Sequence, residues 1–588
     1  MERPIEYGRF EDGSSVNYWE MEPALARAFG HAYRTDAFER AEASLRSFGQ
    51  TVGHRIAPNA EIIDDNGPEL STYDRKGNLV NDVTKHPAQV ENERLAVESG
   101  LIHDALRETS EGQPLGPIHA LGMQTLASYA DVGLVCAISM TAGVALVLEH
   151  HDQSDDFEKL YEELTAQHAE NSSQGAMFLT EQHAGSDVGA IETSAEQIAE
   201  PQAGLPAERT YALNGEKWFC SNIDAQGTLT LARRPGAPEG TDGLSLFWVP
   251  HMLPGGGLNQ QVYRRLKDKL GTESVATGEV VFDGTVGVLL GTPERGFRAM
   301  TTMLNWERVT NATGAAGVLG RALLESKIHT ANRHAFGHRL DAHPLMRRDL
   351  VDMQVDFEAA LVVATEAGRW FDRHHRNPQD EQALARMRGL VPVAKYRTGR
   401  MAVEWTAYAM EIRGGEGYVA DFVHERLLRD AQVLPIWEGA SNVLALDFLR
   451  AVRRVDAGAA LLALIDELLQ PVRHPHLEVA LEAVRTEQDS LEAMLSGMQT
   501  ADRGDAEHRA KELADHAFDV VAASRLLAAA ERRLDAHGDL RTAAVAGWFV
   551  RERLENGPDA ISDTAVDDEL FDAVLRYAQL DPSDRKAV

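Results

Sequence analysis

The chain has 588 residues, of which 44% are hydrophobic, and a formal net charge of −33 at pH 7. This length exceeds one ordinary domain and predicts about three or four structural units, with ample apolar material for a core. A surface this acidic argues against nucleic acid and anionic membranes as partners, because both repel it.

Composition also bears on location. The chain holds 48 arginines against ten lysines, and such an acidic, lysine-poor surface is typical of a salt-adapted protein, although a GC-rich genome also replaces lysine by arginine. Two cysteines, Cys136 and Cys220, form no disulfide framework, and the first residues open no apolar signal region. We therefore expect a cytoplasmic protein.

From residue 24 to about residue 170 the pattern is helical, with polar loops expected around residues 59–83 and 110–117. The most apolar run, residues 132–148, is slightly short for a membrane span and is interrupted by small polar residues. We predict a buried core helix there and no membrane span.

Residues 178–290 have a different texture. Short β-rich runs at 228–232, 244–249 and 278–282 are separated by clusters of glycine and proline. These runs predict a small antiparallel β unit.

Helical periodicity returns after residue 296, with long stretches at 314–334 and 345–374. Residues 456–588 are helical again, with breaks near 471–475 and 557–558. The expected fold class is α+β in four segments, namely an N-terminal helical domain (1–175), a middle antiparallel β-barrel or sandwich (176–295), a helical bundle (296–455) and a C-terminal helical extension (456–588).

One glutamate stands out. Glu438 follows Trp437, precedes Gly439 and is the only charged residue between positions 431 and 446. A carboxylate held among apolar groups has a raised pKa and becomes a usable base. An isolated glutamate is more often a solvated helix residue, so its role depends on the rest of the chain.

Four other motifs contain residues that could contact a ligand. Residues 178–189 combine two glycines with several hydroxyls, so that backbone N–H groups there can approach a flat or anionic ligand. Residues 214–222 set two aromatics beside hydroxyl and amide groups at an expected strand, where they could flank an aromatic cofactor or pack on the sheet. Residues 333–337 and the glycine-rich 413–418 complete the set.

In this order and at these separations, the five motifs resemble the acyl-CoA dehydrogenase family of FAD enzymes, which have an α–β–α fold. The resemblance covers about residues 133–452. Trp-Glu-Gly at 437–439, the stretch 266–271, the long N-terminal region and the C-terminal extension resemble the AidB-type branch, which is similar to isovaleryl-CoA dehydrogenases.

The resemblance implies a reaction. Glu438 matches the base that removes the α-proton of an acyl-CoA thioester, while the β-hydride passes to flavin N5 and leaves a 2-enoyl-CoA. The family stabilises the thioester oxygen with the backbone N–H of that base and a flavin hydroxyl. Electrons would then pass to an electron-transfer flavoprotein.

The resemblance also implies binding residues. FAD-contacting positions are matched by Leu179, Thr180, Ser186, Phe219, Ser221, Arg333, Phe336, Gly414, Gly415 and Asn442. Substrate-contacting positions are matched by Ser186, Arg308, Trp437 and Gly439, although surface pairing is an equal alternative for Arg308, which follows Glu307 at the expected start of a helix. Arg333, Phe336, Gly414 and Gly415 match positions that reach the FAD of a neighbouring subunit, which implies a homodimer or homotetramer.

Three residues depart from the family pattern. Pro344 stands where many relatives carry a FAD-contacting glutamine, Ala440 replaces a common threonine, and Glu411 replaces a glutamine before the Gly-Gly turn. Trp437 is also bulkier than the tyrosine of most relatives, which would reshape an acyl pocket.

Other functions remain open at this point. We expect no metal site, because the helical spacing of His334 and His338 is interrupted by Gly337. The AidB-type resemblance also implies a DNA-associated protective flavoprotein, but residues 456–588 carry 14 basic against 27 acidic side chains, which disfavours phosphate binding. A catalytically silent scaffold is a third alternative, and the presence of Glu438 argues against it.

Overall fold

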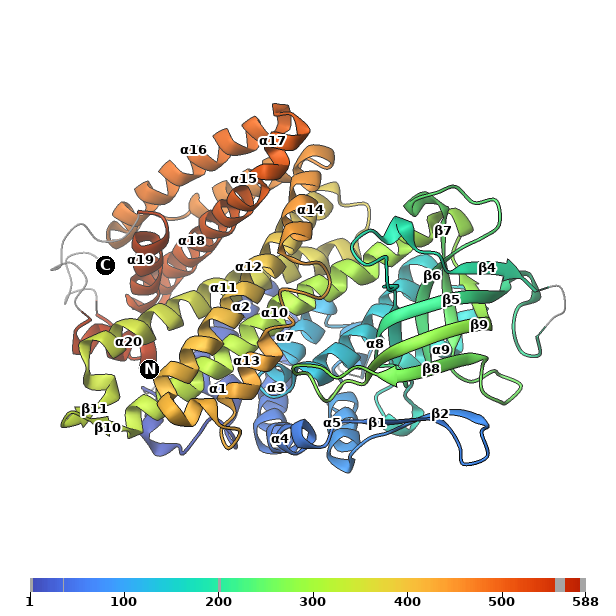
Figure 1. Ribbon diagram of the computed structural model, residues 1–588. Coiled ribbons are helices and arrows are strands. Elements are labelled where there is room, and N and C mark those ends of the chain that lie inside the picture. The colour runs from blue at the N-terminus through green and yellow to red at the C-terminus, as the bar shows by residue number, and fades with distance from the viewer. Residues whose placement is uncertain (1–3, 35, 111, 199–201, 556–565, 582–588) are drawn as a thin grey trace. The chain divides into compact units, whose positions relative to one another are not determined.

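A computed structural model describes residues 4–34, 36–110, 112–198, 202–555 and 566–581 (Figure 1). The chain forms two compact units. The bundle unit, as we call it, gathers Met1–His54, Leu121–Tyr129 and Asn311–Val588, and the barrel unit gathers Arg55–Ala120 and Ala130–Thr310. The four-segment division stays a prediction.

The barrel unit is built on a seven-stranded sheet. Its strands are β3 (Gly175–Phe178), β4 (Ser194–Gln197), β5 (Thr210–Ser221), β6 (Gly227–Arg233), β7 (Leu244–Pro250), β8 (Gln261–Leu266) and β9 (Thr277–Leu290). The strand order is β3-β6-β4-β5-β9-β7, β8 pairs with β9, and an additional β6–β7 pairing closes the sheet on itself. This closure, with β3 and β8 each paired on one side, confirms the expected barrel-like domain.

The sequence predicted an antiparallel unit, but the sheet also contains parallel pairs. β3 runs parallel to β6 over residues 175–178, and Ser194 of β4 also pairs in parallel with Arg233 of β6. Parallel neighbours need a long crossover rather than a tight hairpin, and the loops and strands between residues 178 and 227 supply it. The three strands expected from the sequence lie within β6, β7 and β9.

The prediction of a polar loop at residues 59–83 is wrong. This stretch contains most of helix α4 (Ala57–Asp65) and a hairpin of β1 (Glu69–Tyr73) and β2 (Leu79–Thr84). The Asp74 carboxylate accepts hydrogen bonds from the backbone N–H groups of Lys76 (2.7 Å) and Asn78 (2.9 Å), and Gly77 has φ +81°. Side-chain capping of this turn lets polar strands form a hairpin that hydrophobic periodicity does not reveal.

The helices that lie wholly in the barrel unit are α4, α5 (Pro87–Glu98), α6 (His103–Leu106), α8 (Val132–His151) and α9 (Asp155–Leu164). Helix α8 begins where the Asp131 carboxylate accepts a hydrogen bond from the N–H of Leu134 (3.0 Å), and it confirms the predicted core helix. It is the one described helix long and apolar enough to cross a membrane, and 94% of its most apolar window is buried within the protein.

Helices dominate the bundle unit. Those wholly within it are α1 (Tyr18–Met21), α2 (Pro23–Ala32), α3 (Phe38–Thr51), α11 (Pro344–Arg376), α12 (Glu381–Arg413), α13 (His424–Ala431), α14 (Ser441–Arg454), α15 (Ala457–Leu469), α16 (Glu478–Thr500), α17 (Arg503–His508), α18 (Ala510–His537), α19 (Arg541–Arg553) and α20 (Asp568–Arg576). Helices α7 (Pro117–Ala127) and α10 (Gly296–Asn332) have residues in both units. The predicted break near 471–475 separates α15 from α16, and the predicted break at 557–558 lies outside the described residues.

Described residues near the two ends of the chain are hydrogen-bonded to each other in the bundle unit. The N–H of Ile5 donates to the carbonyl of Arg576 (2.9 Å). Beneath this contact the buried Lys327 ammonium pairs with Glu22 (2.7 Å), whose other oxygen accepts from the Tyr577 hydroxyl (2.6 Å). Glu22 directly precedes α2, Lys327 is on α10 and Tyr577 directly follows α20. The C-terminal segment therefore shares a core with α2 and α10, in which these buried polar groups satisfy one another.

Candidate active site

The segment that joins α13 to α14 carries Glu438 in an unusual backbone conformation. Glu438 has φ +55°, and Gly439 follows with φ +111°. A left-handed conformation is uncommon for a residue with a side chain, and such residues concentrate at functional sites. The side chain of Glu438 is half-buried.

A buried lysine holds this loop. Lys395 on α12 is 0% exposed, and its ammonium donates hydrogen bonds to the carbonyls of Trp437 (2.6 Å) and Gly439 (2.7 Å). These carbonyls flank Glu438 on both sides. Because a trans peptide points its C=O and N–H in opposite directions, the N–H of Glu438 is directed away from Lys395. A cation on the carbonyl also polarises that N–H, which strengthens it as a donor.

Helix α12 and the loop approach each other closely enough to fix this arrangement. A Cβ added to Gly399, one turn beyond Lys395, would lie 3.2 Å from the carbonyl group of Leu434 and 3.3 Å from the nitrogen of Pro435. Among the described residues, the indole N–H of the half-buried Trp437 has no hydrogen-bond partner. A buried donor of this kind beside Glu438 suits a ligand that brings an acceptor.

Helix α14 begins directly after the loop. Ala440 is its N-cap residue and supplies no side-chain hydrogen bond. Asn442, the second residue of the helix, is exposed. A helix N-terminus has unsatisfied N–H groups, so the absence of a capping side chain leaves them available to another acceptor.

Two further predicted segments meet at the ends of α10 and α12. Arg333 lies between α10 and β10 (His334–Ala335), and Phe336, which is 94% exposed, lies in the turn between β10 and β11 (His338–Arg339). Helix α10 therefore ends before Gly337, as predicted, and His334 and His338 are not on one helix. The Arg413 guanidinium contacts Nδ1 of His329 (3.2 Å) and so ties the two helix ends together. Burial, followed by the Arg413 charge, lowers the pKa of His329 to about 4, so His329 is a neutral acceptor near pH 7.

Gly414 and Gly415 follow Arg413. Gly414 has φ +76°, and a Cβ at either glycine would meet no atom within 4 Å. The backbone here is open to a ligand. Lys395 and Gly414 are separated along α12 by about 28 Å, at 1.5 Å per residue. The turn at 414–415 and the loop of Glu438 therefore lie at separate places in one chain.

The barrel unit holds the remaining predicted residues. Leu179 and Thr180 continue from β3, and both are half-buried. The N–H of Trp218 on β5 donates to the carbonyl of Thr180 (2.9 Å). This hydrogen bond brings the motif at 178–189 against the motif at 214–222, as a shared ligand site requires.

A buried ion pair that the sequence analysis missed joins the same two motifs. The Lys217 ammonium, on β5, lies 2.9 Å from the Glu181 carboxylate, and the two residues are 1% and 2% exposed. Glu181 also accepts hydrogen bonds from the backbone N–H groups of Glu192 (2.7 Å) and Thr193 (3.1 Å). Burial raises the pKa of Glu181, but Lys217 and these hydrogen bonds outweigh it and leave the pKa below its usual value. An acid in the first motif and a lysine in the second were the available signal.

Phe219 and Ser221 lie at the end of β5. Phe219 is 56% exposed, whereas the next residue, Cys220, is buried, and the pairing of β5 with β9 is irregular between Lys217 and Cys220. The Lys267 ammonium lies 3.5 Å from the centroid of the Trp218 ring and 5.0 Å from that of Phe219. The Ser221 hydroxyl lies 3.0 Å from that of Thr277. An exposed ring beside a hydroxyl suits a flat, hydrogen-bonding ligand.

Ser186 and Arg308 are the last two site residues predicted from the sequence. Ser186 is exposed in the loop after β3. Arg308 is half-buried and lies well inside α10, so the expectation that it starts a helix is wrong, since the helix begins at Gly296. Its neighbour Glu307 accepts a hydrogen bond from the Ser139 hydroxyl (2.6 Å). In the described part of the chain, no group of three or more His, Cys, Asp or Glu side chains is arranged to hold a metal ion.

The three segments of the chain match three known domain families. Residues 10–171 match the N-terminal domain of the adaptive response protein AidB, residues 176–285 the middle domain of acyl-CoA dehydrogenases, and residues 294–452 their C-terminal domain.

Individual proteins agree with these matches. The chain is 31% identical over 443 residues to acyl-CoA dehydrogenase family member 11 of Caenorhabditis elegans, covering 74% of this chain and 70% of the relative. It is 32% identical over 422 residues to AidB of Escherichia coli (strain K12), covering 70% and 74%. The crystal structure of Caenorhabditis elegans ACDH-11 in complex with C11-CoA superposes with a TM-score of 0.84 at 27% identity, covering 94% of both chains. The chain thus belongs to the acyl-CoA dehydrogenase family and, within it, to the AidB-type branch.

Proposed function

We propose that this chain is an FAD-dependent acyl-CoA dehydrogenase in which Glu438 is the catalytic base. The observation that carries the proposal is the loop of Glu438, whose left-handed backbone is held by hydrogen bonds from Lys395 to the two flanking carbonyls. Such a loop presents a carboxylate and a directed N–H from one residue. Both are needed to remove a proton next to a carbonyl group.

The chain's own groups would then act as follows. The Glu438 carboxylate takes the proton from the α-carbon of the thioester, and the resulting negative charge moves onto the thioester oxygen. The N–H of Glu438 donates to that oxygen and stabilises the charge. FAD, when bound, supplies the acceptor for the hydride that leaves the β-carbon.

The residues present fit a flavin. Phe219 and Ser221 offer an exposed ring beside a hydroxyl, and Leu179 and Thr180 lie on the neighbouring segment. The open backbone at Gly414 suits the close approach of a second part of such a ligand. We assign the FAD-binding role to these residues together with Ser186, Arg333, Phe336, Gly415 and Asn442.

The separation of about 28 Å along α12 supports a site shared between subunits. In this proposal the turn at 414–415 and Arg333 contact the FAD of a neighbouring copy, so that the protein works as a homodimer or homotetramer. Electrons leave through an electron-transfer flavoprotein in the cytoplasm.

An acyl-CoA is the proposed substrate class, with Arg308, Ser186, Trp437 and Gly439 near it. The family supports this class, and so does the relative whose structure contains C11-CoA. We do not prefer the DNA-associated alternative, because the C-terminal 133 residues carry 27 acidic against 14 basic side chains.

The test is an anaerobic titration of the FAD-loaded protein, in high salt, with acyl-CoAs of graded chain length. Loss of oxidised-flavin absorbance with one chain-length class supports the proposal, and Glu438→Gln should keep FAD but lose the response. Glu425→Gln is the matched control, because Glu425 pairs with Arg429 one turn along α13 (2.6 Å). No bleaching by any acyl-CoA, with FAD bound, contradicts the proposal and makes duplex binding the next measurement.

A further inference from the structure

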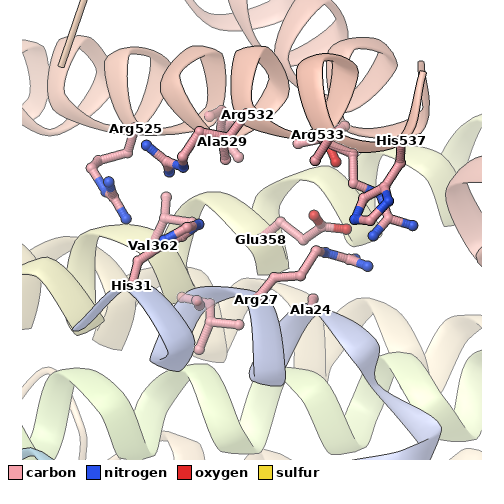
Figure 2. A pocket seen from close by; sticks show the side chains of 15 residues that line it. Ala24, Arg27, His31, Glu358, Val362, Arg525, Ala529, Arg532, Arg533 and His537 are labelled. Carbon is pink, nitrogen blue, oxygen red and sulfur yellow. The ribbon is translucent and has the colours of Figure 1, made fainter. Parts of the chain in front are cut away.

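A cavity lies within the bundle unit, among α2, α11, α18 and the start of α19 (Figure 2). Its volume is about 210 Å³. Much of the wall is aliphatic and buried, with Leu361 and Leu526 at 0% and 1% exposure. The rim includes exposed residues, among them Arg532 and His537. Most of the lining lies outside the family-matched segments that hold the proposed active site.

Positive charge is in excess around this cavity. Figure 2 shows side chains of Arg27, Arg525, Arg532 and Arg533 converging on it from α2 and α18, with Glu358 as the acid between them. Glu358 is already engaged, because Arg541 binds both of its oxygens, one at 2.9 Å. The excess is notable in a chain with a net charge of −33.

Two of the four arginines have acidic partners elsewhere. Arg525 lies 3.2 Å from Glu366, and Arg533 lies 2.9 Å from Asp539. Arg27 and Arg532 have no carboxylate within 4.0 Å among the residues that the structure describes. Arg532 is exposed and solvated, whereas Arg27 is half-buried and its Nη2 is closed to solvent, so the cost of lacking an ion pair falls on Arg27.

Unmet hydrogen-bonding groups line the same cavity. Within the described chain, Nη2 of Arg27 and Oγ1 of Thr542 are buried and have no hydrogen-bond partner. Thr542 is 3% exposed and is the second residue of α19. It has no helical carbonyl four residues earlier, which is the usual acceptor for a threonine hydroxyl in a helix. The cavity thus combines two unpaired hydrogen-bond donors, Arg27 and Thr542, with an aliphatic lining.

The pKa of Arg27 is consistent with a site that lacks an anion. Burial, followed by the nearby charge of Arg541, lowers the pKa of Arg27. A bound anion would reverse both effects, since it would replace lost hydration and offset the repulsion.

We propose that this cavity binds a small aliphatic carboxylate. The carboxylate accepts hydrogen bonds from Arg27 and Thr542, and its chain lies along Leu361, Leu526 and Ala529. An apolar cavity of about 150 Å³ takes benzene, so about 210 Å³ suits a carboxylate of about six carbons. A single negative charge fits the two available donors better than phosphate, which would need more. The inference is independent of the proposed dehydrogenase activity.

The experiment is calorimetric titration of the full-length, FAD-loaded protein with hexanoate, in a buffer with about 1 M chloride to screen surface charge. We expect saturable binding at one site per chain and none with the neutral analogue hexanamide. Arg27→Gln should weaken binding about tenfold or more, the usual effect of losing a hydrogen bond to a charged group. Ala529→Leu, which fills the cavity from α18, should abolish it.

Two control variants test whether any loss of binding is specific to this cavity. Arg509→Gln alters an exposed arginine on the turn before α18, which pairs with Glu512 (3.0 Å) away from the cavity, and should bind normally. Glu438→Gln should also bind normally, which separates this cavity from the proposed active site. Arg27→Gln also removes the contact between this guanidinium and the Tyr577 ring (4.9 Å to the centroid), so Ala529→Leu carries the test should Arg27→Gln fold poorly.

The contrary outcomes are equally definite. Equal binding of hexanamide, equal binding of phosphate as the probe, or unchanged affinity in both cavity variants would each overturn the proposal. So would the absence of saturable binding in the parent protein.

Discussion

The Lys395 ammonium donates to the carbonyl of Trp437 over 2.6 Å and so fixes the peptide group whose N–H belongs to Glu438. Lys395 is the positioning residue of the proposed site. A lysine buried at 0% exposure is costly unless its charge is met, and here two carbonyls meet it. The cost of burying this charge is thus offset by ordering the segment on which the base depends.

Lys395→Met should lower kcat by about a hundredfold or more, the usual cost of misplacing one oxyanion donor. FAD content should change little, because Lys395 contacts the loop rather than the flavin positions. Steady-state kinetics should show the loss in kcat rather than in KM.

The control for this variant is Lys327→Met, which removes an equally buried lysine from the bundle unit. Breaking its ion pair with Glu22 should lower the free energy of unfolding by about 3–5 kcal/mol. Turnover per folded molecule should remain normal. Equal kinetic losses in both variants would show that Lys395 acts through stability alone.

Ala440→Thr should stabilise the protein by about 1 kcal/mol, because the hydroxyl would cap a helix whose present N-cap residue has no side-chain hydrogen bond. Ala440 has φ −64° and ψ 162°, the extended conformation that N-cap residues adopt. Denaturant unfolding measures the gain, with Ala440→Val as the variant that adds similar bulk without a hydroxyl. A gain in both variants would refute the capping explanation.

The Glu181–Lys217 pair should make stability fall in acid. The pKa of Glu181 is below its usual value in the folded protein, so its contribution is present above the unfolded pKa of about 4.3 and is lost as pH falls through the folded pKa. Unfolding free energy measured from pH 6 to pH 2 should decline in this window, and less steeply in Glu181→Gln. The same slope in parent and variant would assign the acid sensitivity to other carboxylates.

A shared flavin site predicts complementation between defective subunits. Arg333→Ala should lose FAD, and Glu438→Gln should lose activity. In a hybrid, the site that takes Glu438 from one subunit and Arg333 from the other is intact. Co-expression with two different tags and purification through both should therefore recover a substantial part of the parent activity. Inactive hybrids with normal assembly would indicate that each flavin is held within one chain.

Much of the fold could be predicted from the sequence. The apolar run at 132–148, the strands within β6, β7 and β9, and the long helices α10 and α11 all follow from hydrophobic periodicity. The hairpin of β1 and β2 could not, because its polar strands depend on the side-chain hydrogen bonds of Asp74. The parallel pairing of β3 with β6 is a long-range contact that local pattern does not encode.

The candidate site, too, could be predicted only in part from the sequence. Glu438 and the flavin motifs were visible as motifs, but the left-handed backbone of Glu438 was not, because glycine would be the ordinary signal for it. Lys395 gave no signal at all, since a lysine within a helix is ordinarily a surface residue. Their relationship depends on α12 packing against a loop some forty residues away.

The central claim is that Glu438 removes the α-proton, and proton exchange tests it most directly. The FAD-loaded protein is incubated anaerobically in D2O with an acyl-CoA whose β-carbon is replaced by sulfur, so that no β-hydride can leave. Mass spectrometry should show deuterium at the α-carbon with the parent and with Glu425→Gln, and none above background with Glu438→Gln. Exchange at the parent rate in Glu438→Gln would contradict the account, because another group would then be the base.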